Sequence, residues 1–367
     1  MQETFTAQRL SRFGQILRQT GFQAMVLTSP ANLFYFTGVW LETGERPNAL
    51  IMIEGKDPVW VVHKMFAEEV QGVPIRAHFW QDGESPYKII AEEMGAKRIY
   101  GVDGSWETRH VLQLMKAVET KDVPILGDDV IRRVRVCKDA EELASLEKAS
   151  QLADEVVGRM KAELSVGQTE AAMAEHLVAL WRNSEAQDMS FPPILAAAKN
   201  GAAPHHEPDA SPLRANSTVI IDTGGVYRHY CSDITRTFIL GEPTQEIRTV
   251  YQLVLDAQRA GIAAAKPGVT LEEVDRACRA VIEEGGYGEY FTHRTGHGVG
   301  IEIHEAPFVV TGNTEKLEVG MVMSVEPGIY LPGKFGVRIE DLVVIEAGGA
   351  RSLNHAPKEL NEVICRI

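Results

Sequence analysis

Two segments of the chain place carboxylates at facing positions within apolar, strand-like runs. The first is STVIIDTGGVYRHYCSDITRTFIL, residues 217–240, with a Gly-Gly turn region between its runs. If the turn is centred between Tyr227 and Arg228, Asp222 lies directly opposite Asp233, with Cβ atoms about 4.5–5.5 Å apart. Two bare carboxylates at that separation repel each other unless a proton or a cation lies between them.

The second segment, MVMSVEPGIYLPGKFGVRIEDLVVI at residues 321–345, has the same arrangement. A turn centred on Gly333 places Glu326 opposite Glu340. A single acidic residue in a strand is most often a strand-end or solvent-facing residue. Two facing pairs with matched geometry instead predict a cation site between two antiparallel hairpins.

A third stretch, HRTGHGVGIEIHEAP at residues 293–307, contains His293, His297 and His304 among three glycines. A surface loop with satisfied histidines is one interpretation. The other is a metal or acid–base site, because glycines let another group approach the main chain closely.

The charges of the four carboxylates favour the metal site. Two divalent cations balance them, and neutral His297 completes the set without changing that balance. Two metals bridged by carboxylates and a hydroxide form a hydrolytic centre. Oxygen-rich ligands favour Mn²⁺, with Co²⁺ or Zn²⁺ as alternatives. Mg²⁺ fits an all-protein site with an imidazole less well.

The organisation of the chain changes near residue 128. Before it, the helical segment TAQRLSRFGQILRQTG and the strand-like segments AMVLTS, ALIMIEG, PVWVVH and RIYGVDG predict an α/β domain over residues 1–127. After it, D-x-x-E at 139–142 and T-x-x-E at 270–273 are capping boxes that open helices. Strand hairpins lie around the later helices, so residues 128–367 predict a helix-plus-antiparallel-sheet domain.

Composition excludes several classes of partner. The formal net charge of −14 argues against nucleic acid or an anionic membrane. The four cysteines are far apart, which is typical of a reducing compartment. The first residues, MQETFTAQRLSRFGQ, lack the apolar run of a signal peptide, and no stretch is long and apolar enough to span a membrane. We therefore expect a cytoplasmic protein.

Taken together, these motifs resemble those of the pita-bread metallopeptidases, which include Xaa-Pro dipeptidase (prolidase), aminopeptidase P and, more distantly, methionine aminopeptidase. The resemblance spans the whole chain and is carried by PHH at 204–206, IDTGG, YCSDITRTF, HRTGHGVGIEIHEAP, SVEPGIY and GVRIED. It implies an α/β creatinase-like N-terminal domain at 1–127 and an α+β pita-bread catalytic domain at 128–367.

The resemblance also implies roles for individual residues. The implied metal ligands are Asp222, Asp233, His297, Glu326 and Glu340. Glu326 would also shuttle a proton to the leaving nitrogen of proline, and His304 would stabilise the tetrahedral intermediate. The implied substrate contacts are His205, His293, Tyr330 and Arg338.

The length of the substrate is harder to predict. A dipeptidase must hold the terminal carboxylate of its substrate, which an arginine does best. NLFYFTGVWLETGERPNALIMI resembles the loop of bacterial prolidases that carries HERF, and would place Arg46 in the partner's site of a homodimer. The sequence departs from HERF at Gly44 and Pro47, and Phe308 replaces an arginine found in some prolidases. Xaa-Pro dipeptidase is the predicted activity, and aminopeptidase P acting on longer peptides is the alternative.

Two other classes compete with this interpretation. IDTGG fits the signature of aspartic proteases, which need two such aspartates. The chain contains one DTG, and that mechanism would leave His297, Glu326 and Glu340 without a role. A non-catalytic pita-bread binding protein is the other class, since creatinase uses the fold without metals. The intact set of implied ligands argues for an enzyme.

Overall fold

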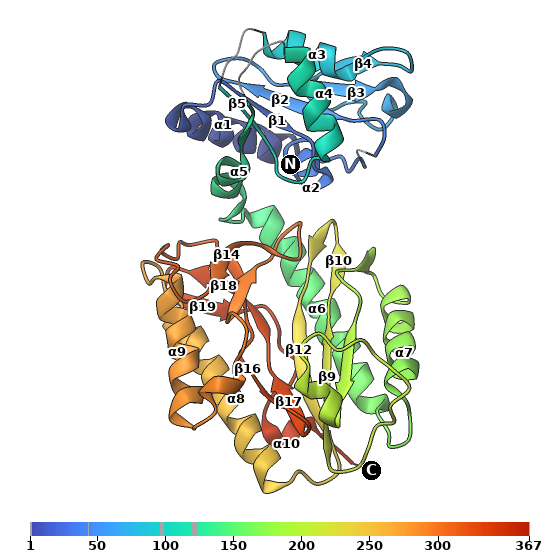
Figure 1. Cartoon of the computed structure of the whole chain (residues 1–367), viewed down its shortest axis with the longest axis vertical. Coiled ribbons are helices and arrows are strands. Elements are labelled where there is room, and N and C mark those ends of the chain that lie inside the picture. The colour runs from blue at the N-terminus through green and yellow to red at the C-terminus, as the bar shows by residue number, and fades with distance from the viewer. Residues whose placement is uncertain (1, 43, 96–98, 119–122, 367) are drawn as a thin grey trace. The chain divides into compact units, whose positions relative to one another are not determined.

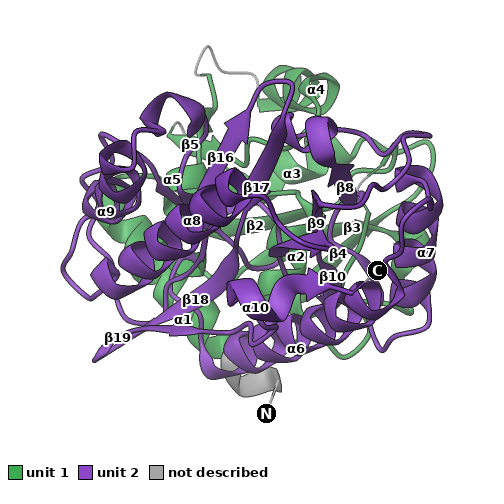
Figure 2. Cartoon of the chain, turned by 90° about the horizontal axis from the view of Figure 1, so that it is seen from below, with its two compact units in different colours: residues 1–135 green, residues 136–367 purple. Residues whose placement is uncertain are grey.

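The structure is a computed structural model that describes residues 2–42, 44–95, 99–118 and 123–366. The chain divides into two compact units, Met1–Arg135 and Val136–Ile367 (Figure 2). Helix α5 (Asp128–Arg135) therefore falls in unit 1, although the sequence places it in the second domain. The domain boundary after residue 127 stays a prediction.

Unit 1 is built on one mixed sheet with the strand order β4-β3-β2-β1-β5-β6 (Figure 1). The pairs β1–β2 and β2–β3 are antiparallel, and the other pairs are parallel. Its strands are β1 (Ala24–Leu27), β2 (Ala49–Ile53), β3 (Val59–His63), β4 (Arg76–Trp80), β5 (Tyr100–Val102) and β6 (Ile125–Leu126). Its other helices are α1 (Gln2–Thr20), α2 (Pro30–Thr37), η1 (Lys64–Phe66), α3 (Pro86–Met94) and α4 (Thr108–Val118). The predicted α/β character of this part of the chain is confirmed.

Unit 2 combines four long helices with short sheets whose strand pairs are antiparallel except for the parallel pair β12–β20. The helices are α6 (Ala140–Glu163), α7 (Glu170–Arg182), α8 (Gln245–Ala264) and α9 (Leu271–Glu284), with the shorter η2 (Ala198–Ala202), η3 (Gly288–Tyr290) and α10 (Leu360–Val363). Both predicted capping boxes form, at Asp139 with Glu142 and at Thr270 with Glu273. The sequence therefore identifies the starts of α6 and α9 correctly.

The sheets of unit 2 lie among these helices (Figure 1). Their strand orders are β11-β10-β7, β20-β12-β9-β8, β14-β13-β15-β18-β19 and β16-β17. The strands are β7 (Asp188–Met189), β8 (Ile194–Ala197), β9 (Ser217–Thr223), β10 (Gly225–Tyr227), β11 (Tyr230–Cys231), β12 (Ile234–Leu240), β13 (Gly296–Gly298), β14 (Glu305–Val309), β15 (Val322–Val325), β16 (Gly328–Leu331), β17 (Phe335–Arg338), β18 (Asp341–Glu346), β19 (Gly349–Ser352) and β20 (Ile364–Cys365). Helices α6 and α7 pack on β7, β8 and β10 to β12, and α8 and α9 pack on β14 to β17 and on β19. One apolar core runs between helices and sheets. None of the helices in the described ranges is long and apolar enough to cross a bilayer.

The register of the first hairpin differs from the prediction. Strands β9 and β12 pair Asp222 with Thr235, so Asp222 is not directly opposite Asp233. The turn is centred one residue later than predicted, between Arg228 and His229, which both have positive φ (49° and 66°). Two consecutive positive-φ residues are typical of a tight hairpin turn, and the Gly-Gly signal drew the prediction away from them. Asp233 lies two residues from Thr235, so it faces the same side of the hairpin on the diagonal.

The predicted register of the second hairpin is confirmed. Gly328 pairs with Arg338 in β16–β17, and Val325 pairs with Asp341 in β15–β18. Both pairs belong to the register centred on Gly333, which also sets Glu326 opposite Glu340.

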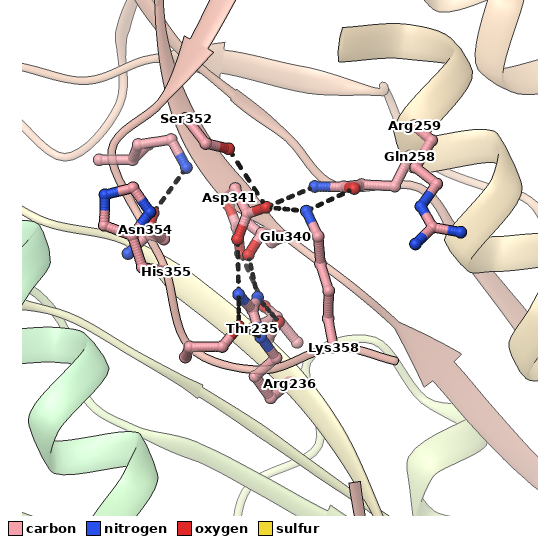
Figure 3. Close-up of polar contacts among 12 residues, drawn as sticks. Thr235, Arg236, Gln258, Arg259, Glu340, Asp341, Ser352, Asn354, His355 and Lys358 are labelled. Carbon is pink, nitrogen blue, oxygen red and sulfur yellow. Dashed lines mark hydrogen bonds and ion pairs between the residues drawn. The ribbon is translucent and has the colours of Figure 1, made fainter. Parts of the chain in front are cut away.

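A buried ionic cluster joins β12, β18, α8 and the C-terminal segment (Figure 3). The Arg236 guanidinium donates to Asp341 Oδ1 at 2.6 Å and to the Glu340 carbonyl oxygen at 2.6 Å, and Arg236 and Asp341 are fully buried. Asp341 also accepts hydrogen bonds from Gln258 (2.9 Å) and Lys358. Burial raises the pKa of the Asp341 carboxyl, but Arg236 and Lys358 outweigh burial and bring it down to about 2. The cluster thus holds a charged carboxylate inside the core directly behind Glu340.

We expect Asp341→Asn to lower the free energy of unfolding of unit 2 by about 3–5 kcal/mol, because it leaves the Arg236 charge buried without its partner. Chemical denaturation of the two proteins measures the difference. Asp256→Asn on the exposed side of α8 is the matched control and should change the free energy by less than about 0.5 kcal/mol. Equal effects of the two substitutions would contradict a stabilising role of the cluster.

Candidate metal centre and active site

A cavity of about 610 Å³ in unit 2 brings most of the predicted site residues together. Those that line it are His205, Asp222, Asp233, His293, His297, His304, Glu326, Arg338 and Glu340. Tyr330 lies behind the wall, where its hydroxyl hydrogen bonds with both His293 and Arg338. Residues selected from separate motifs therefore share one site.

The carboxylates reach the cavity from the two hairpins. Asp222 belongs to β9 and Asp233 precedes β12, while Glu326 follows β15 and Glu340 precedes β18. An isolated bridge between Thr235 and Glu340 joins the hairpins, and the Thr235 hydroxyl donates to Glu340 Oε2 at 2.7 Å. The diagonal offset of the two aspartates thus leaves all four carboxylates in the same cavity.

The glycines around His297 are required by close strand packing. A Cβ on Gly296 would lie 2.0 Å from the Ser324 carbonyl oxygen, and one on Gly298 would lie 2.2 Å from the Ala306 carbonyl oxygen. Strand β13 can therefore pass between β15 and β14 only without these side chains. The bare backbone brings the His297 ring into contact with the acidic cluster.

The hydrogen bonding of His297 suits a metal ligand. Its Nδ1 lies 3.1 Å from the Gly298 carbonyl oxygen, which can only accept, so Nδ1 carries the proton and Nε2 keeps a free lone pair. Nε2 lies 3.3 Å from Glu326 Oε1 and 3.6 Å from Asp233 Oδ2. One ligand atom each of Asp233, His297 and Glu340 lie within 4.8 Å of one another.

Two carboxylate oxygens lack the partner that burial demands. Asp222 Oδ1 and Glu340 Oε1 are buried and have no hydrogen-bond partner among the described residues. A buried acceptor without a partner is costly, and a divalent cation is a partner that carboxylates and imidazole bind well. The donor set therefore fits a metal centre.

The protonation equilibria of the cluster reflect the same crowding. Burial, followed by repulsion from neighbouring carboxylates, raises the pKa values of Asp233 and Glu340 well above the ordinary range. Burial is also the main cause that raises the pKa of Glu326 to about 7. Burial, with the charge of His304, lowers the pKa of His297 to about 3, so its ring is neutral at pH 7. Without cations, protons must relieve the repulsion.

The guanidinium group of Arg338 is held in the wall of the cavity by hydrogen bonds to three side chains. It donates from Nη2 to Asp222 Oδ2 at 2.6 Å, from Nη1 to the Tyr330 hydroxyl at 2.8 Å and from Nε to Thr235 Oγ1 at 3.1 Å. Burial lowers its pKa, but Tyr330, Asp222 and Glu326 outweigh burial, so the net pKa is well above the ordinary value. Arg338 therefore holds Asp222 Oδ2 and fixes the orientation of that carboxylate.

The same arginine fixes the direction of the hydrogen bonds that lead through Tyr330 to His293. Because Arg338 donates to the Tyr330 oxygen, the hydroxyl proton of Tyr330 is left for His293 Nε2, 2.8 Å away. His293 Nδ1 donates to the Arg294 carbonyl oxygen at 2.7 Å. Burial lowers the pKa of His293 to about 4 and raises that of Tyr330 to about 12. His293 is thus a neutral ring with both nitrogens engaged.

A second cluster, Glu170 with His206 and Asp209, supports the segment that carries His205. Glu170 is fully buried and accepts hydrogen bonds from the backbone N–H of Ala197 at 2.7 Å and from His206 Nε2 at 2.8 Å. It also accepts from the Asn200 amide and the Asp209 N–H. Since its oxygens are already satisfied, the cluster acts as an anchor for residues 197–209.

Sequence reasoning missed part of the cavity wall. Phe191, Pro192 and Ile194 line it and supply apolar surface, and Arg294 lines it as well. The run SFPPIL at 190–195 was the available signal, because two consecutive prolines beside an aromatic residue are unusual in a regular element. No sequence pattern distinguished Arg294 from its neighbours in the motif HRTGHG.

Arg46 lies in unit 1. It donates from Nε and Nη2 to the two carboxylate oxygens of Asp82, both at 3.1 Å, and from Nη1 to Glu45 at 2.9 Å. Its role at a partner's site stays a prediction.

We expect removal of metal to make the stability of unit 2 depend on pH. A carboxyl whose pKa is raised by folding stabilises the folded state when it is protonated. This contribution to the free energy of unfolding is fully present below the unfolded pKa of about 4. It is lost as the pH rises through the folded value, about 7 for Glu326. Calorimetry in EDTA should therefore show a melting temperature that falls from pH 5 to pH 8, and saturating Mn²⁺ should remove most of that fall. The same pH dependence with and without Mn²⁺ would contradict a cation site here.

Comparison with known proteins agrees with this geometry. Residues 144–347 match the model of metallopeptidase family M24, and residues 9–137 match the creatinase/prolidase N-terminal domain. A relative named probable dipeptidase PepE, from Mycobacterium tuberculosis, is 37% identical over 361 residues, which are 96% of each chain.

Solved structures extend the comparison to the fold. Dipeptidase PepE from Mycobacterium ulcerans superposes with a TM-score of 0.93 at 35% identity, covering 100% of both chains. A recombinant prolidase from Thermococcus sibiricus gives a TM-score of 0.90 at 35% identity, covering 98% of this chain and 99% of the prolidase. Aminopeptidase P of E. coli, at 20% identity and a TM-score of 0.85, shares the fold. The predicted combination of a creatinase-like N-terminal domain and a pita-bread catalytic domain is confirmed, and the chain belongs to metallopeptidase family M24.

Proposed function

We propose that this peptidase hydrolyses the Xaa-Pro bond of dipeptides with two divalent metal ions. The observation that carries the proposal is the buried carboxylate cluster beside His297, with its two unpartnered oxygens. The ions would be held by Asp222, Asp233, His297, Glu326 and Glu340. Similarity to proteins named dipeptidase and prolidase supports dipeptides as substrates.

The donor set also narrows the choice of metal. Four carboxylates and one imidazole form an oxygen-rich set, for which Mn²⁺ is the first candidate, with Co²⁺ and Zn²⁺ as alternatives. When bound, such ions make hydroxide available near neutral pH by lowering the pKa of water.

Other residues of the cavity have roles in proton transfer, oxyanion stabilisation and substrate contact. Glu326 accepts a hydrogen bond from the Ser324 hydroxyl at 3.2 Å, and it holds the proton that passes to the leaving imino nitrogen. His304, whose ring centroid lies 4.4 Å from that of His297, donates an N–H to the developing oxyanion. His205 lines the same cavity and contacts the substrate.

The cavity also offers a surface suited to proline. The amide before proline has no N–H, so recognition relies on ring shape and on the groups at either end of the substrate. Phe191, Pro192 and Ile194 provide apolar surface for a pyrrolidine ring, and the neutral His293 beside Tyr330 provides a polar edge without charge.

We further propose that the protein is a cytoplasmic homodimer. None of the four cysteines, which all lie in the described ranges, forms a disulfide, as expected in a reducing compartment. A dimer is also the arrangement in which Arg46 of one subunit would reach the site of the other.

A substrate panel tests the proposed activity. With added Mn²⁺, kcat/KM should be higher for Xaa-Pro dipeptides than for the matched Xaa-Pro-Yaa tripeptides, and Xaa-Ala dipeptides should be poor substrates because they lack the ring. EDTA should abolish cleavage. Preference for the tripeptides would replace this proposal with aminopeptidase P, and cleavage that resists EDTA would exclude metal-dependent hydrolysis.

The two neighbouring histidines should respond differently to substitution. We expect His297→Ala to lose bound metal, because it removes a ligand. His304→Ala should retain metal and lose mainly kcat, because it removes a contact made in the transition state. Metal analysis after dialysis, together with steady-state kinetics, separates the two effects. Equal metal loss in both variants would show that His304 also binds metal.

A further inference from the structure

Two arginines line the cavity, and they differ in how their charges are used. Arg338 is buried and bound to Asp222, Tyr330 and Thr235, as described above. Arg294 is half-buried, and no carboxylate among the described residues forms an ion pair with it. Of the arginines on the described wall of the cavity, Arg294 is therefore the one whose guanidinium can take a new anionic partner.

The position of Arg294 is fixed on both sides. Its guanidinium carbon lies 4.8 Å from the centroid of the Phe308 ring, within the range of a cation–π interaction. Its backbone carbonyl accepts the His293 Nδ1 hydrogen bond, and the His293 carbonyl accepts a bond from Arg279 at 2.6 Å. The contact with the partly exposed Phe308 ring holds the guanidinium group, and no described residue accepts a hydrogen bond from its N–H groups.

The charge of Arg294 also reaches the reacting groups. Arg294 lines the same cavity as Glu326, His297 and His304, so it lies close to both the acidic cluster and the proposed oxyanion donor. An anion bound to Arg294 would consequently lie near the scissile bond of a short peptide.

A dipeptide creates a need for such a cation. Its terminal carboxylate is only one residue beyond the scissile bond, and enclosing that charge without a partner is costly. The four carboxylates of the cavity have the same sign of charge and offer it no partner. A guanidinium beside them meets a carboxylate with two parallel hydrogen bonds, whereas an amide at the same place can offer only one acceptor.

We propose that Arg294, stacked on Phe308, binds the terminal carboxylate of the dipeptide within the same chain and thereby sets the substrate length. This assignment rests on the proposed Xaa-Pro activity. It differs from the role predicted for Arg46, which already holds Asp82 through two hydrogen bonds and would need a partner subunit.

The test compares Ala-Pro with Ala-Pro-amide, which differ only in the terminal charge. Arg294→Ala should raise KM for Ala-Pro about 10- to 100-fold, the range for a charge-assisted hydrogen bond, and change KM for the amide less than about threefold. Arg294→Lys should recover part of the loss for Ala-Pro, because it restores the charge without the planar fork. Arg276→Ala, an exposed arginine on α9, is the matched control and should leave both substrates unchanged.

Each other outcome has a distinct meaning. Equal losses for the two substrates in Arg294→Ala, with metal content and melting temperature unchanged, would overturn the assignment. A loss confined to Ala-Pro in Arg46→Ala but not in Arg294→Ala would transfer the role to Arg46. If the wild-type protein cleaves neither Ala-Pro nor its amide while cleaving other peptides, the proposed function itself fails, and this assignment fails with it.

Discussion

Repulsion among buried carboxylates is the constraint around which unit 2 is built. Asp222, Asp233, Glu326 and Glu340 enter one cavity from two hairpins. Burial and mutual repulsion raise the pKa values of the last three, and Asp222 and Glu340 each have one buried oxygen without a partner among the described residues. The apolar core, the hairpin bridge and the glycines beside His297 all keep these groups close in spite of their repulsion. The fold thus maintains a repulsion among carboxylates that a bound proton reduces and that a divalent cation, with its larger charge, reduces further.

Two arginines hold the residues around the acidic cluster in place. Arg338 fixes Asp222 from one direction, and Arg236 fixes the backbone of Glu340 while holding the buried Asp341. The adjacent residues Glu340 and Asp341 therefore have opposite electrostatic surroundings: the first has a raised pKa, and the second has a pKa near 2. Strand alternation explains the contrast, because neighbouring side chains point to opposite faces of a strand. One face serves the cavity, and the other serves the core.

The sequence predicted the catalytic unit well where the physics is local. Capping boxes depend on residues three positions apart, and the second hairpin depends on a turn with one strong glycine signal, so both could be identified. The first hairpin was placed one residue off, because its positive-φ turn uses Arg228 and His229 in place of glycine. Asp222 and Asp233 still reached one cavity, since a diagonal pair shares a face. The run SFPPIL marks an irregular segment, but its place on the cavity wall beside Arg294 depends on how distant segments fold over the hairpins, which no local pattern encodes.

The anchor at Glu170 separates the place where a substitution acts from the place where its effect appears. Glu170 is the first residue of α7 and lies outside the cavity wall, yet it holds the backbone of Ala197 and the side chains of Asn200 and His206 around the segment that presents His205. Inherited variation at this helix start would alter the chemistry of the cavity while every residue on its surface stayed the same. Relatives can therefore differ in activity through a substitution in this buried anchor, and a comparison restricted to the residues of the cavity would miss it.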